Sequence, residues 1–378
     1  MRFDTIIIGG GLAGLTAGIR LQEEGRRTAI VSSGQSALHF FSGSFESLKG
    51  CPEAEELFDR AGVRLHNVPG GRRLLPGGAF REAVLSLGDV SLLPAEGPIG
   101  KKALIVSFNG YHDFFPELLA GALEKDGTPC IQGIVEMEEL AALRKSPTEM
   151  RSVNIARVLD KCPDKFVQKV KELLADGVDT VILPQVFGLD GDEVPRAISE
   201  GLAPLKVIFV GTLPPSVPGI RTQNMLRGRY ERLGGTFIIG DSVVSGAVHE
   251  GVVSSVASHN LDTYRLFADN FILCSGSFFS KGLHSSPTSI EEPVFGLDVE
   301  FPEDRSLWYE ADFFEPQPYM GIGVKADKDL HPSIGGEKVT NLYVAGAILG
   351  ASKDGKYGTG AGKAIKSALA AANKILSL

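Results

Sequence analysis

A group of glycines near the N-terminus has the spacing needed to bind a phosphate. Gly9, Gly11 and Gly14 fit the pattern G-x-G-x-x-G, and Leu12 and Ala13 lie between the last two glycines. A short apolar run rich in β-branched residues precedes the pattern, and a segment with helical spacing follows it. Such a turn directs backbone N–H groups and the positive end of a helix dipole toward an anion. The pattern therefore predicts that these five residues contact the phosphate of a bound ligand.

The position that usually binds an adenosine ribose carries hydroxyl groups in this chain. Dinucleotide folds place Asp or Glu there, about 20 residues after the glycines. Here the second strand ends in Ser32 and Ser33. A hydroxyl can form one hydrogen bond to a ribose, but the carboxylate is missing. Either the adenosine is held differently or the ligand has none, and the residues alone leave both open.

The elements that would position these groups are those of a parallel sheet. Residues 3–8 and 28–31 read as buried strands, joined by the helix that the glycines open. Near the C-terminus, residues 342–345 form a further apolar run that ends in Gly346. A helix with one apolar face is expected over residues 361–376. These segments, far apart in the chain, are thus expected to meet in one α/β domain.

Two of the later segments resemble signatures of the two-dinucleotide-fold flavoproteins. Residues 341–346, NLYVAG, resemble NLY-x-AG-(D/E), and residues 268–277, ADNFILCSGS, resemble AD-x-(V/I)(V/I)-x-A-(T/S)-G. In that family the acid holds the ribityl chain, and the N-terminus of the following helix faces the flavin. Ala347 occupies the acidic position here. The resemblance implies a Rossmann-like α/β flavin-binding domain.

The middle of the chain carries an α/β pattern of its own, which predicts an inserted cap or substrate lobe. The flavin-binding domain is expected to comprise residues 1–110, 216–283 and 334–378. The cap lobe is expected to comprise residues 111–215 and 284–333. Because no second G-x-G-x-x-G follows a strand, a separate nicotinamide domain is not expected.

The segment after the second strand carries a more distinctive pattern. Residues 35–44 read QSALHFFSGS. Together with the N-terminal FDTIIIGGGLAGLTAGIRLQEEG, this phrase resembles the B-type flavoprotein subunits of the anaerobic glycerol-3-phosphate dehydrogenases. That family is similar in fold to fumarate-reductase-type flavoproteins. The resemblance is dense near the N-terminus and recurs in the middle and C-terminal signatures.

This resemblance implies a flavin-dependent enzyme subunit that oxidises sn-glycerol 3-phosphate to dihydroxyacetone phosphate. Its implied partners are an A-type flavin subunit and a C-type iron–sulfur, membrane-associated subunit, through which electrons reach quinone. It favours FMN over FAD, which would explain Ser32 and Ser33, while the dinucleotide-type layout keeps FAD open. Two other hypotheses about function also stay open. One is a stand-alone flavin oxidoreductase of a small organic acid, and the other is a flavin-carrying structural subunit without its own substrate site.

The resemblance also assigns residues to the site. His39 is the expected catalytic base or flavin contact, because the loop after the second strand runs along the isoalloxazine in related flavoproteins. Arg221 and Arg227 could reach a phosphate, although solvated positions on a helix are their default. The expected flavin contacts come from the glycine pattern, this loop and the C-terminal signatures: Gly9, Gly11, Leu12, Ala13, Gly14, Ser32, Ser33, Gln35, Ser36, Ala37, Ser42, Gly43, Ser44, Gly276, Gly346, Ala347, Thr359 and Gly360.

The composition of the chain limits the functions that it can have. The chain has 378 residues, of which 43% are hydrophobic and 22% charged, as is ordinary for a globular protein. Its formal charge of −8 and the lack of a basic cluster argue against nucleic-acid binding. Four cysteines without a C-x-x-C pair predict no zinc site and no iron–sulfur cluster from this chain alone. With neither a long apolar run nor a signal peptide in the sequence, we expect a cytoplasmic location and membrane contact only through a partner.

Overall fold

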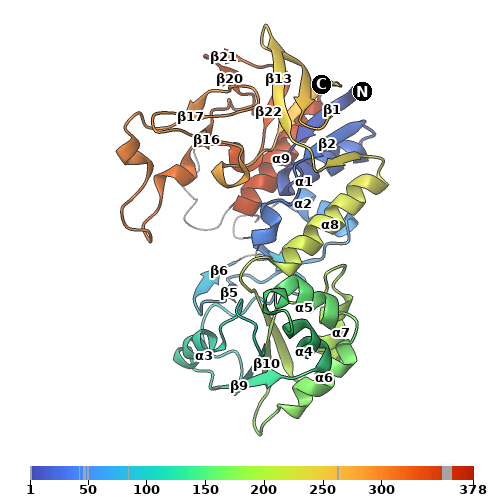
Figure 1. Cartoon of the computed structure of the whole chain (residues 1–378), viewed down its shortest axis with the longest axis vertical. Helices are drawn as coiled ribbons and strands as arrows, with labels where there is room; N and C mark the ends of the chain where they lie inside the picture. Colours follow the sequence, from blue (N-terminus) through green and yellow to red (C-terminus); the bar gives the residue numbers. More distant parts are fainter. Residues whose placement is uncertain are drawn as a thin grey trace. The chain divides into compact units, whose positions relative to one another are not determined.

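A computed structural model shows two compact units, each with its own sheet and hydrophobic core (Figure 1). The first unit comprises Met1–Ala37, Glu46–Ala61 and Leu226–Leu378, and the second comprises Leu38–Phe45 and Gly62–Met225. The structure describes residues 2–41, 43–45, 48, 51–83, 85–261, 264–350 and 360–378.

The first unit is built on a seven-stranded sheet. The strand order is β12-β2-β1-β15-β14-β13, and β22 pairs with β15 as well. β1, β2, β12, β15 and β22 are parallel, whereas β13 and β14 are antiparallel to their neighbours. The strands are β1 (Arg2–Ile8), β2 (Thr28–Ser32), β12 (Thr236–Ile239), β13 (Val243–His249), β14 (Val252–Ser258), β15 (Leu266–Leu273) and β22 (Leu342–Val344).

The centre of this sheet is apolar because both of its faces are covered. Ile6 and Ile7 in β1, and Phe271 and Ile272 in β15, are fully buried. Helix α1 (Leu12–Glu23) follows β1 directly and packs against α9 (Gly360–Leu376). A further helix, α2 (Pro52–Arg60), contacts both α1 and α9. Helices α1 and α9, from opposite ends of the sequence, thus lie side by side (Figure 1).

Short hairpins between β15 and β22 pack onto the core of the first unit. Ile290, Leu297 and Trp308 share one hydrophobic core with Phe271. This differs from the expectation that residues 284–333 belong to the cap lobe, because their scattered apolar side chains bury against the first sheet. The paired strands are β16 (His284–Ser285) with β17 (Ile290–Glu291), β18 (Val299–Glu300) with β19 (Gly323–Val324), and β20 (Ser333–Ile334) with β21 (Glu337–Lys338).

The second unit contains a parallel four-stranded sheet in the order β11-β10-β8-β9. Its strands are β8 (Ala103–Phe108), β9 (Cys130–Val135), β10 (Thr180–Pro184) and β11 (Lys206–Val210). Its helices are α3 (Pro116–Lys125), α4 (Glu138–Arg144), α5 (Ser152–Leu159), α6 (Pro163–Glu172) and α7 (Glu193–Gly201). Strands and helices alternate along the chain, which gives the α/β pattern expected for the middle region.

The boundary expected at residue 110 also shifts. β8 is an inner strand of the second sheet, between β10 and β9, so residues 62–110 belong to the second unit. Two small sheets precede β8: β3 (Ser44–Phe45), β7 (Leu85–Leu87) and β4 (Leu65–Asn67) form one, and β5 (Arg72–Leu74) and β6 (Phe80–Glu82) form the other. Helix α8 (Val217–Arg232) carries the boundary to the first unit, between Met225 and Leu226.

Candidate functional site

The glycine pattern forms a tight turn between β1 and α1 in which side chains have no room. Gly9 has a φ of +113°, and a Cβ there would lie 2.2 Å from the carbonyl oxygen of Cys274, just after β15. A Cβ on Gly14 would lie 1.9 Å from the carbonyl oxygen of Gly9. These two glycines therefore allow strand and helix to pack more closely than any larger residue would permit.

Gly11 differs from its neighbours because it faces open space. A Cβ there would meet, among the described residues, a single atom within 4 Å, the Cβ of Ser36 at 3.5 Å. Gly11 is the N-cap of α1, no side chain in the described part of the chain caps this end, and the first turn has no acidic residue. The amides of Leu12, Ala13 and Gly14 begin a helix whose positive end is neither capped nor neutralised. An anionic phosphate fits this turn.

The C-terminal signatures reach the same end of the sheet. Gly346 follows β22 with a φ of +85°, and a Cβ there would lie 3.0 Å from the Cβ of Ala13. Gly276 follows β15 with a φ of +81°, one residue after Ser275. The Ser275 hydroxyl is buried and has no hydrogen-bond partner within the described residues. An unpaired buried hydroxyl is costly, so its place beside the glycine turn fits a ligand that supplies the missing hydrogen bond.

The end of β2, where dinucleotide folds carry the ribose-binding carboxylate, carries two serines. The Ser32 hydroxyl is buried and donates to the carbonyl of Gly34 at 3.2 Å, while Ser33 is exposed. Asp241 lies nearby, and its backbone N–H donates to the carbonyl of Ser32 at 3.2 Å. Its carboxylate accepts hydrogen bonds from the Ser258 hydroxyl and from the backbone N–H groups of residues 242 and 260. The available carboxylate is therefore committed to its own loop.

These hydrogen bonds also set the ionisation of Asp241. Burial raises the pKa of this carboxyl, but the hydrogen bonds from Ser258, Asn260 and Ser242 outweigh burial and lower the pKa below its usual value. Asp241 thus stays ionised while it stabilises the turn after β12. No local pattern pointed to this residue, because it follows β12 rather than β2.

The remaining predicted flavin contacts lie in several places. Ser36 and Ala37 end the first unit's N-terminal segment, with Gln35 exposed before them. Ala347 is exposed after β22, and Gly360 begins α9. The structure places two others in the second unit: Gly43 is buried, and Ser44 pairs with Ser86 across β3 and β7. Ser42 and Thr359 lie outside the described residues.

His39 lies on a short 3-10 helix, Ala37–Phe40, and is assigned to the second unit. Its carbonyl oxygen accepts a hydrogen bond from the backbone N–H of Ser216 at 2.8 Å, which ties this segment to the chain just before α8. The imidazole is half-buried, and burial lowers its pKa below the usual 6.5. His39 is therefore neutral near pH 7, the form in which a histidine accepts a proton.

The two candidate arginines on α8 have structural partners. Arg221 is buried, and its Nη2 lies 2.5 Å from both carboxylate oxygens of Asp89. Its Nη1 also donates to the carbonyl of Gly188 at 2.6 Å. The expectation of a solvated or phosphate-binding Arg221 is therefore wrong. Arg227 is partly exposed, pairs with Glu231 at 3.0 Å and lies over the ring of Phe237.

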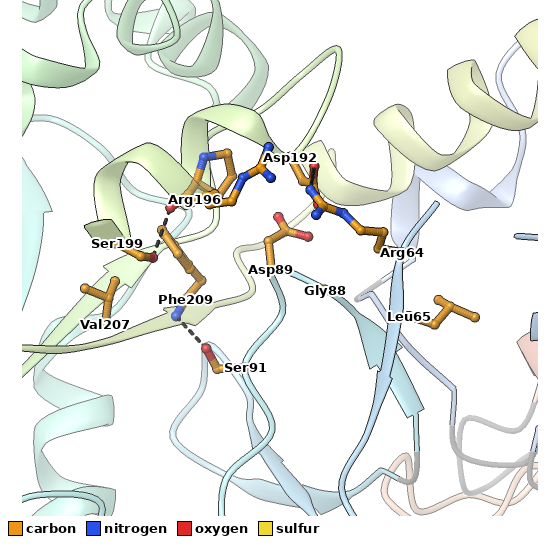
Figure 2. A pocket seen from close by; sticks show the side chains of 11 residues that line it. Arg64, Leu65, Gly88, Asp89, Ser91, Asp192, Arg196, Ser199, Val207 and Phe209 are labelled. Carbon is orange, nitrogen blue, oxygen red and sulfur yellow. Dashed lines mark hydrogen bonds and ion pairs between the residues drawn. The ribbon is translucent and has the colours of Figure 1, made fainter. Parts of the chain in front are cut away.

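The sequence did not reveal a cavity of about 410 Å³ within the second unit (Figure 2). Arg64, Asp192 and Arg196 lie around the carboxylate of Asp89, and Phe209 contributes to the apolar wall. The chain gives no local signal for this grouping, since 128 residues separate Arg64 from Asp192.

Among the described residues, the charged side chains of this cavity leave one cation without an ion pair. Arg64 pairs with Asp192 at 2.5 Å, and the buried Arg221 neutralises Asp89. Arg196 forms no ion pair within the part of the chain that the structure describes. With Arg64 and Arg196 at its edge, the cavity favours a small anion that carries polar groups.

Known proteins similar to this chain include flavin-binding proteins. The chain matches the FAD binding domain family over residues 4–50 and 46–363. It is 39% identical, over 100% of its length and 99% of the relative, to the B-type subunit of anaerobic glycerol-3-phosphate dehydrogenase from Pectobacterium carotovorum subsp. carotovorum. The corresponding subunit of Haemophilus influenzae is 34% identical, with 100% of both chains covered. The chain belongs to the family of B-type subunits of anaerobic glycerol-3-phosphate dehydrogenase.

Among solved structures, THI4 from Thermovibrio ammonificans is similar to the chain with a TM-score of 0.39 and 10% identity, over 100% of this chain and 89% of that chain.

Membership in this family confirms the fold class and the expectation of a flavin-dependent dehydrogenase. The matching domain family is described as FAD binding, so the preference for FMN receives no support from it. Among the described residues, no group of three or more His, Cys, Asp or Glu side chains could hold a metal ion. Within the same residues, no helix is both long enough and apolar enough to cross a membrane.

Proposed function

We propose that this chain works as the B-type subunit of an anaerobic glycerol-3-phosphate dehydrogenase and binds FAD through its first unit. Full-length similarity to named subunits of this type carries the proposal. The uncapped N-terminus of α1 at Gly11 supports it, because a flavin nucleotide requires an anion site of this kind. FAD is the proposed form, and residues from the glycine turn, β2, β15 and β22 are its proposed contacts.

The proposed reaction is the oxidation of sn-glycerol 3-phosphate to dihydroxyacetone phosphate. The flavin, when bound, supplies the acceptor for the hydride that leaves C2 of the substrate. His39 is the proposed base that takes the C2 hydroxyl proton, and its lowered pKa keeps it neutral for this role. Arg64 and Arg196 line the cavity of the second unit, which is a proposed binding site for a small phosphorylated ligand, because guanidinium groups match phosphate oxygens in geometry and charge.

The proposed partners are the A-type flavin subunit and the C-type iron–sulfur, membrane-associated subunit. Electrons would leave this chain for the iron–sulfur subunit and then reach quinone. The four free cysteines support this division of labour, because they are scattered along the chain and no group of three or more His, Cys, Asp or Glu side chains among the described residues could hold a metal. The proposed location is the cytoplasm, with the inner membrane reached through the complex.

A first experiment identifies the cofactor and the substrate together. The chain is purified with and without its two co-expressed partners, its visible spectrum is recorded, and the flavin is released by heat and identified by chromatography. We expect FAD, and we expect glycerol 3-phosphate to drive quinone reduction by the complex. A colourless chain that binds neither FAD nor FMN on titration would leave a structural role. Activity of the isolated chain on a small organic acid would favour a stand-alone enzyme.

A second experiment tests the phosphate ligands. Arg196→Ala removes a cation that forms no ion pair with the described residues, and it should raise the dissociation constant of glycerol 3-phosphate by about 10- to 150-fold, the range of one lost hydrogen bond to a charged group. Arg81→Ala, at an exposed arginine of the same unit outside the cavity, is the matched control. Flavin content should stay constant in both variants. An unchanged dissociation constant in Arg196→Ala would remove the cavity from the proposal.

A further inference from the structure

A run of exposed apolar side chains is concentrated in residues 305–320 of the first unit, which we call the aromatic loop. Phe313 and Phe314 are 82% and 88% exposed, and their rings contact each other with centroids 5.6 Å apart. Leu307, Tyr309 and Met320 are also exposed. Isolated apolar side chains on a surface are normal, but several large ones in one short segment indicate an interaction site.

Hydrogen bonds within the aromatic loop fix its conformation and keep these side chains exposed. The amide of Gln317 donates to the carbonyls of Asp312 at 2.9 Å and Glu315 at 3.2 Å, and it accepts from the backbone N–H of Glu310 at 3.1 Å. The carboxylate of Asp312 accepts from the backbone N–H of Phe314 at 2.9 Å. The two phenylalanines therefore sit at a defined turn, and ordering them on binding would cost little entropy.

Both ends of the loop are anchored to the first unit. Trp308 is buried, its indole N–H donates to the carbonyl of Pro302 at 2.7 Å, and its ring packs edge-on against Phe301. Tyr319 contacts the ring of Phe278, on the 3-10 helix Phe278–Ser280 that follows β15. Trp308 and Tyr319 thus fix the position of the exposed residues that lie between them.

The charge of the segment favours a protein over a membrane surface as the binding partner. Five acidic residues accompany a single basic residue, Arg305, in this stretch and the two positions before it: Glu303, Asp304, Glu310, Asp312 and Glu315. Membrane-surface segments instead combine aromatic side chains with lysine and arginine, because the headgroups of the cytoplasmic leaflet are anionic. An acidic aromatic surface matches a protein that presents an apolar pocket edged by basic side chains.

We propose that the aromatic loop is the docking surface for a partner subunit of the complex, with Phe313 and Phe314 inserted into an apolar pocket edged by lysine or arginine. This inference rests on the proposed function, because that function supplies the partner. Aromatic side chains at the centre of an interface carry most of its binding free energy, and acidic residues around them direct the approach of a basic surface.

The test is a double variant, Phe313→Ser with Phe314→Ser, co-expressed with the two partners and analysed by size-exclusion chromatography and titration. We expect the dissociation constant of the complex with the subunit that binds the aromatic loop to rise at least about 100-fold. Two phenylalanines buried in that interface would be lost. Tyr264→Ser, at an exposed aromatic residue outside the loop, is the matched control and should associate normally. Flavin content and the melting temperature of the free chain should not change.

Charge reversal gives an independent readout. Glu310→Lys with Glu315→Lys should slow association and reverse its salt dependence, without removing the hydrogen bonds that these residues make through their backbones. Normal association of the double phenylalanine variant, alongside a complex that forms with the wild type, would overturn the inference while the proposed function stands.

Three other results would also overturn the inference. Binding of the wild-type chain to anionic phospholipid vesicles, lost in the phenylalanine variant, would assign the loop to a membrane. Self-association lost in the same variant would assign it to a second copy of the chain. A wild-type chain that binds neither partner would remove both this inference and the proposed complex. Normal flavin content in that chain would show that it is folded.

Discussion

Replacement of Gly11 by alanine separates cofactor binding from folding. Gly11 has an extended backbone, with φ of −83° and ψ of −168°, which any residue adopts. The added Cβ would lie 3.5 Å from the Cβ of Ser36, an ordinary contact. The free energy of unfolding of the apoprotein should therefore stay within about 1 kcal/mol of the wild type, because alanine's restriction of the unfolded chain opposes its poorer fit at the N-cap of α1. The methyl group would, however, occupy the space through which a phosphate approaches α1.

The cost to flavin binding can be estimated from one hydrogen bond to a charged group. Loss of such a bond at the helix N-terminus amounts to about 1.5–3 kcal/mol, which corresponds to a rise in the dissociation constant of about 10- to 150-fold. Titration of the apoprotein with FAD, followed by flavin fluorescence, measures this constant. Differential scanning calorimetry of the same samples measures the unfolding.

Two further glycine variants complete the comparison. Gly121→Ala adds a Cβ that meets nothing within 4 Å among the described residues around α3, and it should leave the flavin dissociation constant unchanged. Gly14→Ala would force a Cβ to within 1.9 Å of the Gly9 carbonyl and should destabilise the apoprotein itself. The reasoning would be refuted by a Gly11→Ala protein that melts normally and binds FAD as tightly as the wild type.

Three other variants or conditions have defined outcomes. Arg221→Met should lower the free energy of unfolding in urea by about 3–5 kcal/mol, because it leaves Asp89 buried and unpaired, and Asp89→Leu in the same chain should recover part of the loss. Burial lowers the pKa of His39 below 6.5, so its contribution to stability is present above pH 6.5 and is lost as the pH falls through the lowered value. If His39 is the base, the acidic limb of kcat/KM lies below pH 6.5, and His39→Gln removes that limb. Burial raises the pKa of the Cys274 thiol to about 12, so a thiol reagent at about pH 8 should modify this residue only after unfolding, as peptide mass mapping would detect.

Local patterns predicted the glycine turn well because its chemistry is local. The strand, the glycines and the helix occur in one stretch, and the turn conformation at Gly9 can be inferred from spacing alone. The signatures around Gly276 and Gly346 also reach the predicted end of the sheet, since parallel strands bring their carboxyl ends together.

Features that depend on distant partners were not predictable from local patterns. Arg221 looked like an exposed helix residue because its partner, Asp89, is 132 positions away. The ion pair of Arg64 with Asp192 was hidden for the same reason. Residues 284–333 carry few regular apolar periods, so their packing on the core of the first sheet could not be read from periodicity.

The pairing of β1 with β15, and of β15 with β22, has a consequence for biosynthesis. The second unit is nearly continuous in sequence, so most of its chain is available to fold while translation continues. The sheet of the first unit needs β22 and the covering helix α9, which leave the ribosome after the other strands and α-helices of this unit. Until then the nascent strand β15 presents an apolar edge without its neighbour β22, a state that binds chaperones and aggregates readily. Truncations near the C-terminus should therefore appear first as loss of soluble yield, before any effect on catalysis can be measured.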